Sequence, residues 1–105
     1  MDMNRITEQE IFKPAMKIVA SNPNGVSTSR LINEVMRKMN PKGEDMRILK
    51  NRGDVKFTQK VRNLISHRNN ATSIIRRGYL RYEAGRPSGK LFITQKGQAY
   101  LNNNP

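Results

Sequence analysis

Four side chains that can both donate and accept hydrogen bonds recur at helical spacing in the stretch QKVRNLISHRNN. They are Gln59, Asn63, Ser66 and Asn70. On a helical wheel this polar row lies opposite an apolar stripe made of Phe57, Val61, Leu64 and Ile65. Side-chain amides pair with N6 and N7 of adenine, and hydroxyls contact base edges. The row therefore predicts a base-reading surface, whereas the plainest alternative is the solvated face that every amphipathic helix has.

Basic side chains flank this polar row. Lys56, Lys60 and His67 follow one margin, and Arg62 follows the other. Lys and Arg hold phosphates, which orient a protein on a duplex without reading its sequence. Arg68 falls near the apolar stripe of a continuous helix, so we expect the helix to end close to it. For His67, a neutral hydrogen-bonding role and a DNA contact both fit.

The charge distribution favours a polyanionic partner. The 105 residues include 20 Lys and Arg and 8 Asp and Glu, for a net charge of +12. Residues 1–54 hold ten basic and seven acidic side chains, a net of +3, whereas residues 55–105 hold ten basic side chains and only Glu83, a net of +9. Soluble surfaces usually mix both signs. The basic second half therefore predicts attraction to DNA, RNA or an anionic membrane.

Catalysis and metal binding have few candidate residues. The chain has no cysteine and one histidine, so disulfides and the usual zinc sites are excluded. No Glu-x-Lys pattern, Gly-rich phosphate loop or nucleophile elbow occurs. We expect no catalytic activity and no cofactor. No apolar run approaches the roughly 20 residues of a membrane span, and no secretory leader is visible, so a cytoplasmic, nucleoid-associated protein is expected.

Local signals in the first half predict two helices. Thr7 and Glu10 form a capping-box pattern at the start of a helix that continues to about Ser21. Pro14 predicts a kink or a break within it, and residues 22–25 predict a turn. Val26 is expected as a bridging β residue, and Ser27 or Thr28 begins the second helix. Its expected buried face consists of Leu31, Ile32, Val35, Met36 and Met39.

The second half is expected to hold the polar row on a third helix, followed by a hairpin. The third helix should begin near Asp54 and run as one long helix, or as two pieces joined at residues 69–70, toward Gly78. Residues 45–50 suggest a short helix, and residues 51–54 a loop. Two β runs, residues 79–83 and 90–93, flank a turn rich in Gly and Pro. Thr94 then caps a helix to about Leu101, so a single domain is expected over residues 1–101, with a flexible tail at 102–105.

The expected hairpin carries Arg86 at its tip and Arg81 and Lys90 on its strands. Basic hairpins contact phosphates or the minor groove, but edge strands also use cations to prevent aggregation. Tyr79 and Tyr82 fit the core better than a base-stacking surface. The fold class expected is mainly α with a small β-hairpin (α+β). The element order is that of a winged helix-turn-helix, whose third helix enters the major groove beside the hairpin.

Residues 57–68, 77–80 and 93–101 together resemble the winged-helix DNA-binding domains attached to bacterial restriction enzymes, as at the N-terminus of Mrr-type proteins. The resemblance implies recognition of duplex DNA in a restriction system, with Arg62, Asn63, Ser66 and His67 at the matching positions. It also implies a nuclease domain or subunit as a partner. Some domains of this kind read methylated adenine.

The function expected is that of a non-catalytic module that binds double-stranded DNA. Two alternatives remain open: a winged-helix protein-interaction or transcription-regulator module with an acidic partner, and a module that binds structured RNA. The residues predicted to contact DNA are Lys56, Gln59, Lys60, Arg62, Asn63, Ser66, His67, Arg68, Asn70, Arg81, Arg86 and Lys90.

Overall fold

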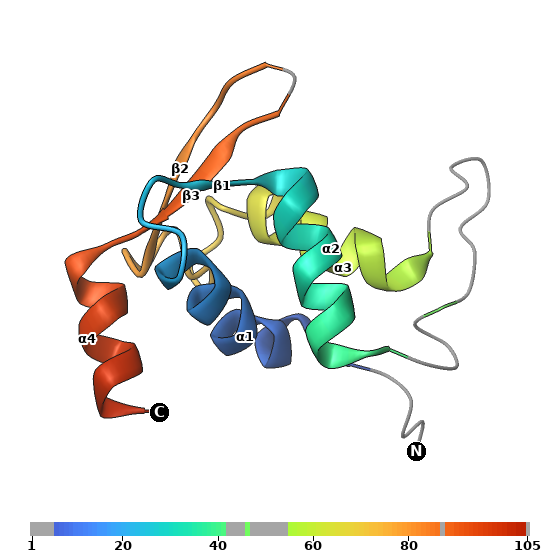
Figure 1. Cartoon of the computed structure of the whole chain (residues 1–105), viewed down its shortest axis with the longest axis horizontal. Helices are drawn as coiled ribbons and strands as arrows, with labels where there is room; N and C mark the ends of the chain where they lie inside the picture. The colour runs from blue at the N-terminus through green and yellow to red at the C-terminus, as the bar shows by residue number, and fades with distance from the viewer. Residues whose placement is uncertain (1–5, 42–45, 47–54, 87, 105) are drawn as a thin grey trace.

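The computed structural model describes residues 6–41, 46, 55–86, 88–104 of the chain. Within these ranges the fold is α+β, with four helices and a three-stranded antiparallel sheet. The elements in chain order are α1 (Glu8–Ala20), β1 (Val26–Ser27), α2 (Thr28–Met39), α3 (Lys56–Ser66), β2 (Leu80–Glu83), β3 (Lys90–Ile93) and α4 (Gln95–Asn103). Figure 1 shows the β2–β3 hairpin projecting beyond the helices, with α2 and α3 on one side and α4 on the other.

Helix α1 begins at the predicted capping box. The Glu10 backbone N–H donates to Thr7 Oγ1 at 3.2 Å, and the Thr7 backbone N–H donates to Glu10 Oε1 at 3.0 Å. The helix continues through Pro14 to Ala20, so the predicted break at Pro14 is wrong. Proline removes one backbone donor there, but the buried residues Ile11 and Ala15 anchor the helix on both sides of it.

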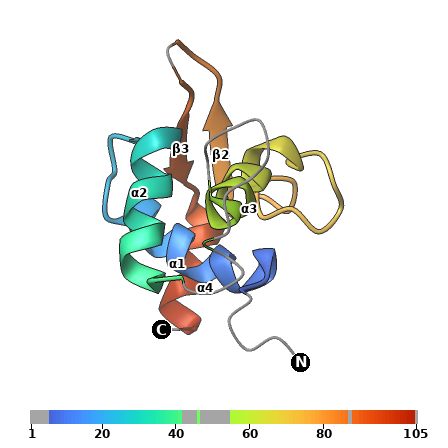
Figure 2. The same cartoon turned by 90° about the vertical axis from the view of Figure 1, so that its right-hand side faces the viewer.

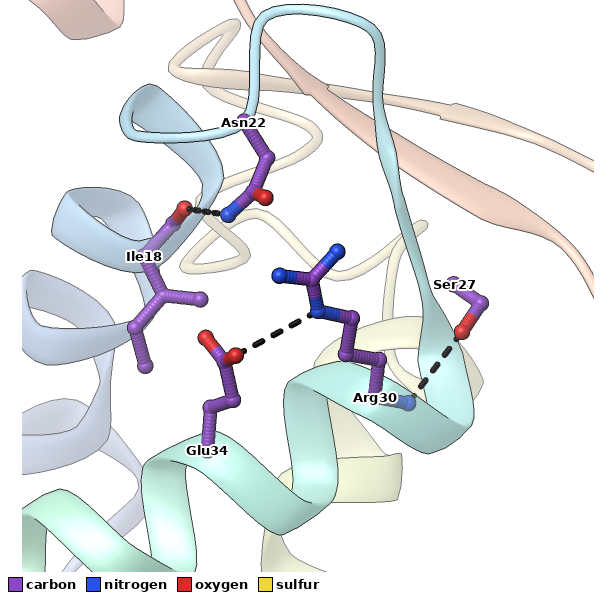
Figure 3. A network of polar contacts seen from close by, with 5 residues as sticks. All are labelled: Ile18, Asn22, Ser27, Arg30 and Glu34. Carbon is purple, nitrogen blue, oxygen red and sulfur yellow. Dashed lines mark hydrogen bonds and ion pairs between the residues drawn. The ribbon is translucent and has the colours of Figure 1, made fainter.

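The turn and second helix form where the sequence predicts them. Asn22 Nδ2 donates to the Ile18 carbonyl at 2.7 Å, and the Arg30 backbone N–H donates to Ser27 Oγ at 3.2 Å (Figure 3). Gly25 has a φ of +95°, a left-handed conformation that glycine adopts without strain. Asn40 ends α2 in the same region, with a φ of 48°.

The sheet has the strand order β1-β3-β2, in which the two-residue strand β1 pairs with the predicted hairpin and confirms the bridging β residue expected at Val26. Val26 pairs with Leu91, and Leu91 also pairs with Tyr82 on β2. Because side chains alternate along a strand, these three lie on one face, where Val26 and Leu91 are fully buried. The opposite face carries the pair Arg81 and Phe92. The sheet thus has one core face and one outer face.

The buried hydrophobic side chains form one cluster that includes residues of all four helices and all three strands. Helix α3 contributes Phe57, Val61 and Leu64, whose exposed fractions are 0%, 1% and 3%. Burial of these three side chains fixes which way α3 faces, since rotation about its axis would expose them. The part of the chain with described coordinates contains no helix long and apolar enough to cross a membrane.

Helix α3 is shorter than predicted and ends at Ser66. Residues 67–79 form successive turns, so both predicted continuations, one long helix or a second helical piece, are wrong. Ser73 explains part of this outcome. Its Oγ accepts the backbone N–H groups of Ile75 and Arg76 at 3.1 and 3.3 Å, which replaces helical bonding with a local turn. Gly78, with a φ of +87°, then leads into β2.

The last helix begins at the predicted cap, where the Gly97 backbone N–H donates to Thr94 Oγ1 at 3.0 Å. Helix α4 continues to Asn103, two residues beyond the predicted end. Gly97 has a packing role, because a Cβ at this position would lie 2.1 Å from the Tyr79 carbonyl oxygen. The predicted short helix at 45–50 and the loop at 51–54 lie outside the described residues, except for Met46. Helix α3 begins at Lys56, two residues after the predicted start near Asp54.

Candidate nucleic-acid interface

The polar row predicted on α3 divides between two sides of the helix. Gln59, Arg62 and Asn63 are half-buried, whereas Ser66 is exposed. Thr58 is buried at 8% exposure, although the sequence analysis did not place it in the apolar stripe. Phe57 and Val61 belong to the predicted apolar stripe, whereas the hydroxyl of Thr58 is polar, so the sequence did not predict that Thr58 is buried. The buried face of α3 therefore includes Thr58 in addition to residues of the predicted apolar stripe.

One side of the row is joined to the start of α1. Asn63 Nδ2 donates to Glu8 Oε2 at 3.1 Å, and Gln59 Nε2 donates to Asn63 Oδ1 at 2.9 Å. His67 Nδ1 lies 3.3 Å from Glu8 Oε1. Glu8 is thus a residue of the site that the sequence analysis missed. No periodicity could have found it, because it lies 55 positions before Asn63.

Lys60 lies on the same side. Its Nζ donates to the Ile6 carbonyl at 2.5 Å, so the ammonium group is directed toward the residue before the α1 cap. Lys56, Lys60 and His67 were predicted to form a phosphate-holding margin. The structure brings Lys60 and His67 to the N-terminal end of α1 and leaves Lys56 half-buried in the first turn of α3.

Three residues that were predicted to lie on α3 follow its end: His67 is the cap, and Arg68 and Asn70 come after it. Asn70 is exposed in a turn, so its predicted place in the helical row is wrong, because the helix ends at Ser66. Arg68 confirms the expectation that the helix ends close to it. Its Nη1 donates to the Ile65 carbonyl at 2.8 Å, and its Cζ lies 5.3 Å from the Tyr82 ring centroid. Arg68 therefore connects the end of α3 to the hairpin.

The other side of the row faces a concavity between α2, α3 and the hairpin. This space of about 320 Å³ is lined by residues that include Thr28, Arg62, Ile65, Ser66, Tyr82 and Gly89. The Thr28 backbone N–H donates to the Gly89 carbonyl at 3.1 Å, which joins the start of α2 to the hairpin. Figure 2 shows α3 beside the base of the hairpin. Arg62 and Ser66 are thus brought together with polar groups of two other elements.

The basic residues of the hairpin differ in their surroundings. Arg81 forms an ion pair with Glu83, and its Cζ lies 4.4 Å from the Phe92 ring centroid on the outer face of the sheet. Arg86 and Lys90 are exposed. Arg81 was predicted to contact DNA, but its charge is partly balanced by the only carboxylate of the second half. Arg86 and Lys90 are the better-placed cations for a polyanion.

Gly89 is needed where the hairpin meets Tyr82. A Cβ on Gly89 would lie 2.3 Å from Tyr82 Oη, so Gly89→Ala is expected to displace the ring and lower the free energy of unfolding by about 1–3 kcal/mol. Denaturant titration would measure the loss. Gly85→Ala is the matched control, because its nearest contact would be the Ser88 carbonyl at 3.5 Å. Equal stability of the two variants would contradict the packing described for Gly89.

Donors, acceptors and exposed cations make up this surface, and it can bind through hydrogen bonds and charge. Within residues 6–41, 46, 55–86 and 88–104, no group of three or more His, Cys, Asp or Glu side chains is arranged to hold a metal ion. No known protein-family model, curated protein or solved structure matches the chain.

Proposed function

We propose that the chain binds double-stranded DNA as a winged helix-turn-helix, with α3 in the major groove and the β2–β3 hairpin on phosphates or in the minor groove. One observation carries this proposal: Arg62 and Ser66 of α3 line a concavity that they share with the start of α2 and the hairpin. The order of elements and the β1-β3-β2 sheet support the same arrangement. The major groove, about 12 Å wide, accepts one helix of this kind.

Basic groups of the chain contribute both long-range attraction to DNA and direct contacts with phosphates. Residues 55–105 carry a net of +9, which attracts a duplex over several ångströms of solvent. The exposed Arg86 and Lys90 hold phosphates, as does Arg62 beside the start of α2. The N-terminal end of α2 adds the partial positive charge of a helix start on the same side. Such contacts give affinity and register without sequence preference.

Asn63, Gln59 and Ser66 supply the sequence preference. Amides pair in bidentate fashion with adenine, and a hydroxyl accommodates several bases. The module serves target recognition in a restriction or modification-dependent system, where a separate nuclease domain or subunit cuts the DNA and methylated adenine is the base read. Selection from a random duplex pool, with and without adenine methylation, identifies the preferred site. No enrichment in either pool would contradict base reading.

On the selected site, Asn63→Ala is expected to weaken binding by about 1–3 kcal/mol, because it removes the base-reading amide. On random duplex DNA the loss should be much smaller. Fluorescence anisotropy with labelled duplexes measures both dissociation constants. Arg86→Ala is the matched control, since loss of a phosphate contact weakens both duplexes alike.

Two outcomes would redirect the assignment. If Asn63→Ala leaves the preferred site unaffected while the duplex still binds, α3 does not read bases through this residue. If the wild-type protein fails to retain duplex DNA even at low salt, the basic surface serves another partner. Preference for structured RNA in the same assay would identify that partner as RNA. If neither nucleic acid binds, an acidic protein is the remaining candidate for the partner.

A further inference from the structure

We propose that Glu8 of α1 is a positioning residue for Asn63, and that it sets the Asn63 amide in the one orientation that reads adenine. This inference rests on the proposed DNA binding and deepens it by naming the base and the residue that selects it. Glu8 itself does not contact the base. It acts through Asn63, to which it is joined across the interface between α1 and α3.

The geometry is a chain of three side chains from two helices. Glu8 Oε2 accepts from Asn63 Nδ2 at 3.1 Å, and Asn63 Oδ1 accepts from Gln59 Nε2 at 2.9 Å. An amide turned by 180° would place its oxygen against the carboxylate and its N–H groups against another donor. The Glu8 carboxylate can only accept, so it requires that the N–H side of the Asn63 amide face it, and the Gln59 amide then donates to the Asn63 oxygen. Rotation of the Asn63 amide would lose the bond to Glu8 and place two acceptor oxygens against each other.

The contacts leave the reading capacity of Asn63 intact. A side-chain amide has two N–H donors and two acceptor lone pairs. Glu8 uses one N–H, and Gln59 uses one lone pair. One donor and one acceptor remain, which is the pattern complementary to N7 and N6–H of adenine. Glu8 and Gln59 thus constrain the amide without consuming the groups that a base requires.

Two observations favour a role of Glu8 beyond helix stability. The α1 cap is already complete, because Thr7 and Glu10 satisfy each other's backbone N–H groups. The Glu8 carboxylate lies beside the helix proposed to bind DNA and repels phosphates, so it lowers the affinity for DNA. Glu8 is nevertheless held there from both sides, with Asn63 on Oε2 and His67 3.3 Å from Oε1.

The test compares two carboxylates of the same helical turn. Glu8→Ala and Glu10→Gln remove the same charge from the first turn of α1, and a glutamine at the second position can still accept the Thr7 backbone N–H and keep the cap. Of the two carboxylates only Glu8 bonds to Asn63. Dissociation constants are measured for the selected duplex and for random duplex DNA. Glu8→Ala is expected to reduce the ratio of the two affinities by about three- to tenfold, the range for one hydrogen bond. Glu10→Gln should change both affinities alike and leave the ratio unchanged.

Glu8→Gln is a conservative variant that tests whether the hydrogen bond alone preserves the preference for the selected duplex. Its amide oxygen still accepts from Asn63 Nδ2, so this variant should retain most of the preference although it has lost the same charge as Glu8→Ala. A ratio that falls equally in both Glu8 variants would assign the effect to charge and overturn the positioning role. Thermal unfolding of each variant, run beside the binding assay, ensures that only folded protein is compared.

A readout without DNA separates this inference from the function on which it rests. The side-chain amide resonances of Asn63 in ¹H–¹⁵N spectra should shift in Glu8→Ala and stay in place in Glu10→Gln, which keeps the cap. If the wild-type protein shows no preference among duplexes, the proposed function fails and the positioning role fails with it, whatever the spectra show. If the wild-type protein discriminates but Glu8→Ala discriminates equally, or its Asn63 resonances do not move, only the role of Glu8 is overturned.

Discussion

Raising the salt concentration from about 50 to about 200 mM is expected to weaken duplex binding by roughly two to three orders of magnitude. A protein that neutralises phosphates releases condensed counterions, and added salt opposes that release. Arg62 lines the concavity, and Arg86 and Lys90 are exposed on the hairpin. With contacts from backbone N–H groups added to these three cations, we expect about four to six phosphate contacts in all. The slope of log affinity against log salt should then lie between about −3.5 and −5.5. Anisotropy titrations at several salt concentrations measure it.

Single variants then assign the slope to particular residues. Arg86→Ala should make it less steep by about one, because it removes one phosphate contact at the exposed hairpin tip. Lys38→Ala is the matched control. It removes the same charge from the last turn of α2, at the end of that helix far from the hairpin in Figure 1, so the slope should not change. A slope near zero for the wild-type protein would falsify the electrostatic basis of the proposed function.

Phe57→Ala is expected to lower the free energy of unfolding by about 3–5 kcal/mol. The ring has no exposed surface and lies in the first turn of α3, where it joins this helix to the core. Small domains have only about 5–15 kcal/mol of stability in total. The melting temperature should therefore fall by more than about 10 °C, and duplex binding should fall with the folded fraction. Circular dichroism during heating measures the transition.

Phe92→Ala is the control for this substitution. Phe92 is half-buried on the outer face of the sheet, where Arg81 lies over its ring, so removal of the ring leaves less of a cavity. Its loss of stability should be clearly smaller. Comparable losses for the two variants would mean that the core does not depend on α3 in the way that burial of Phe57 indicates.

Prediction from the sequence succeeded where structure depends on neighbours in the chain. The Thr7 and Thr94 caps and the turn at 22–25 rest on bonds between residues a few positions apart, and the hairpin strands pair residues 7 to 13 positions apart across a single turn. The apolar stripe of α3 was predicted for the same reason, because helical spacing alone brings Phe57, Val61 and Leu64 to one face. The charge of the second half is likewise a property of composition.

The continuation of α3 could not be predicted in this way. Ile74 restores the helical spacing of apolar residues and is buried, yet it reaches the core from a series of turns. Residues 69–73 include Asn, Thr and Ser side chains, which bond to nearby backbone groups and so compete with helix formation. Spacing therefore predicted which residue is buried here, but it did not predict the backbone that carries it.

The sequence by itself determined the helix caps, the hairpin, the core stripe and the positive charge, since each depends on local bonding, spacing or composition. Only the tertiary structure decided which polar groups of α3 meet other elements. Glu8 and Asn63 come within 3.1 Å although 55 positions separate them, and Arg62 and Ser66 meet the hairpin through packing of α3 on the core. Such contacts depend on how buried faces orient whole helices, and no local pattern specifies that orientation.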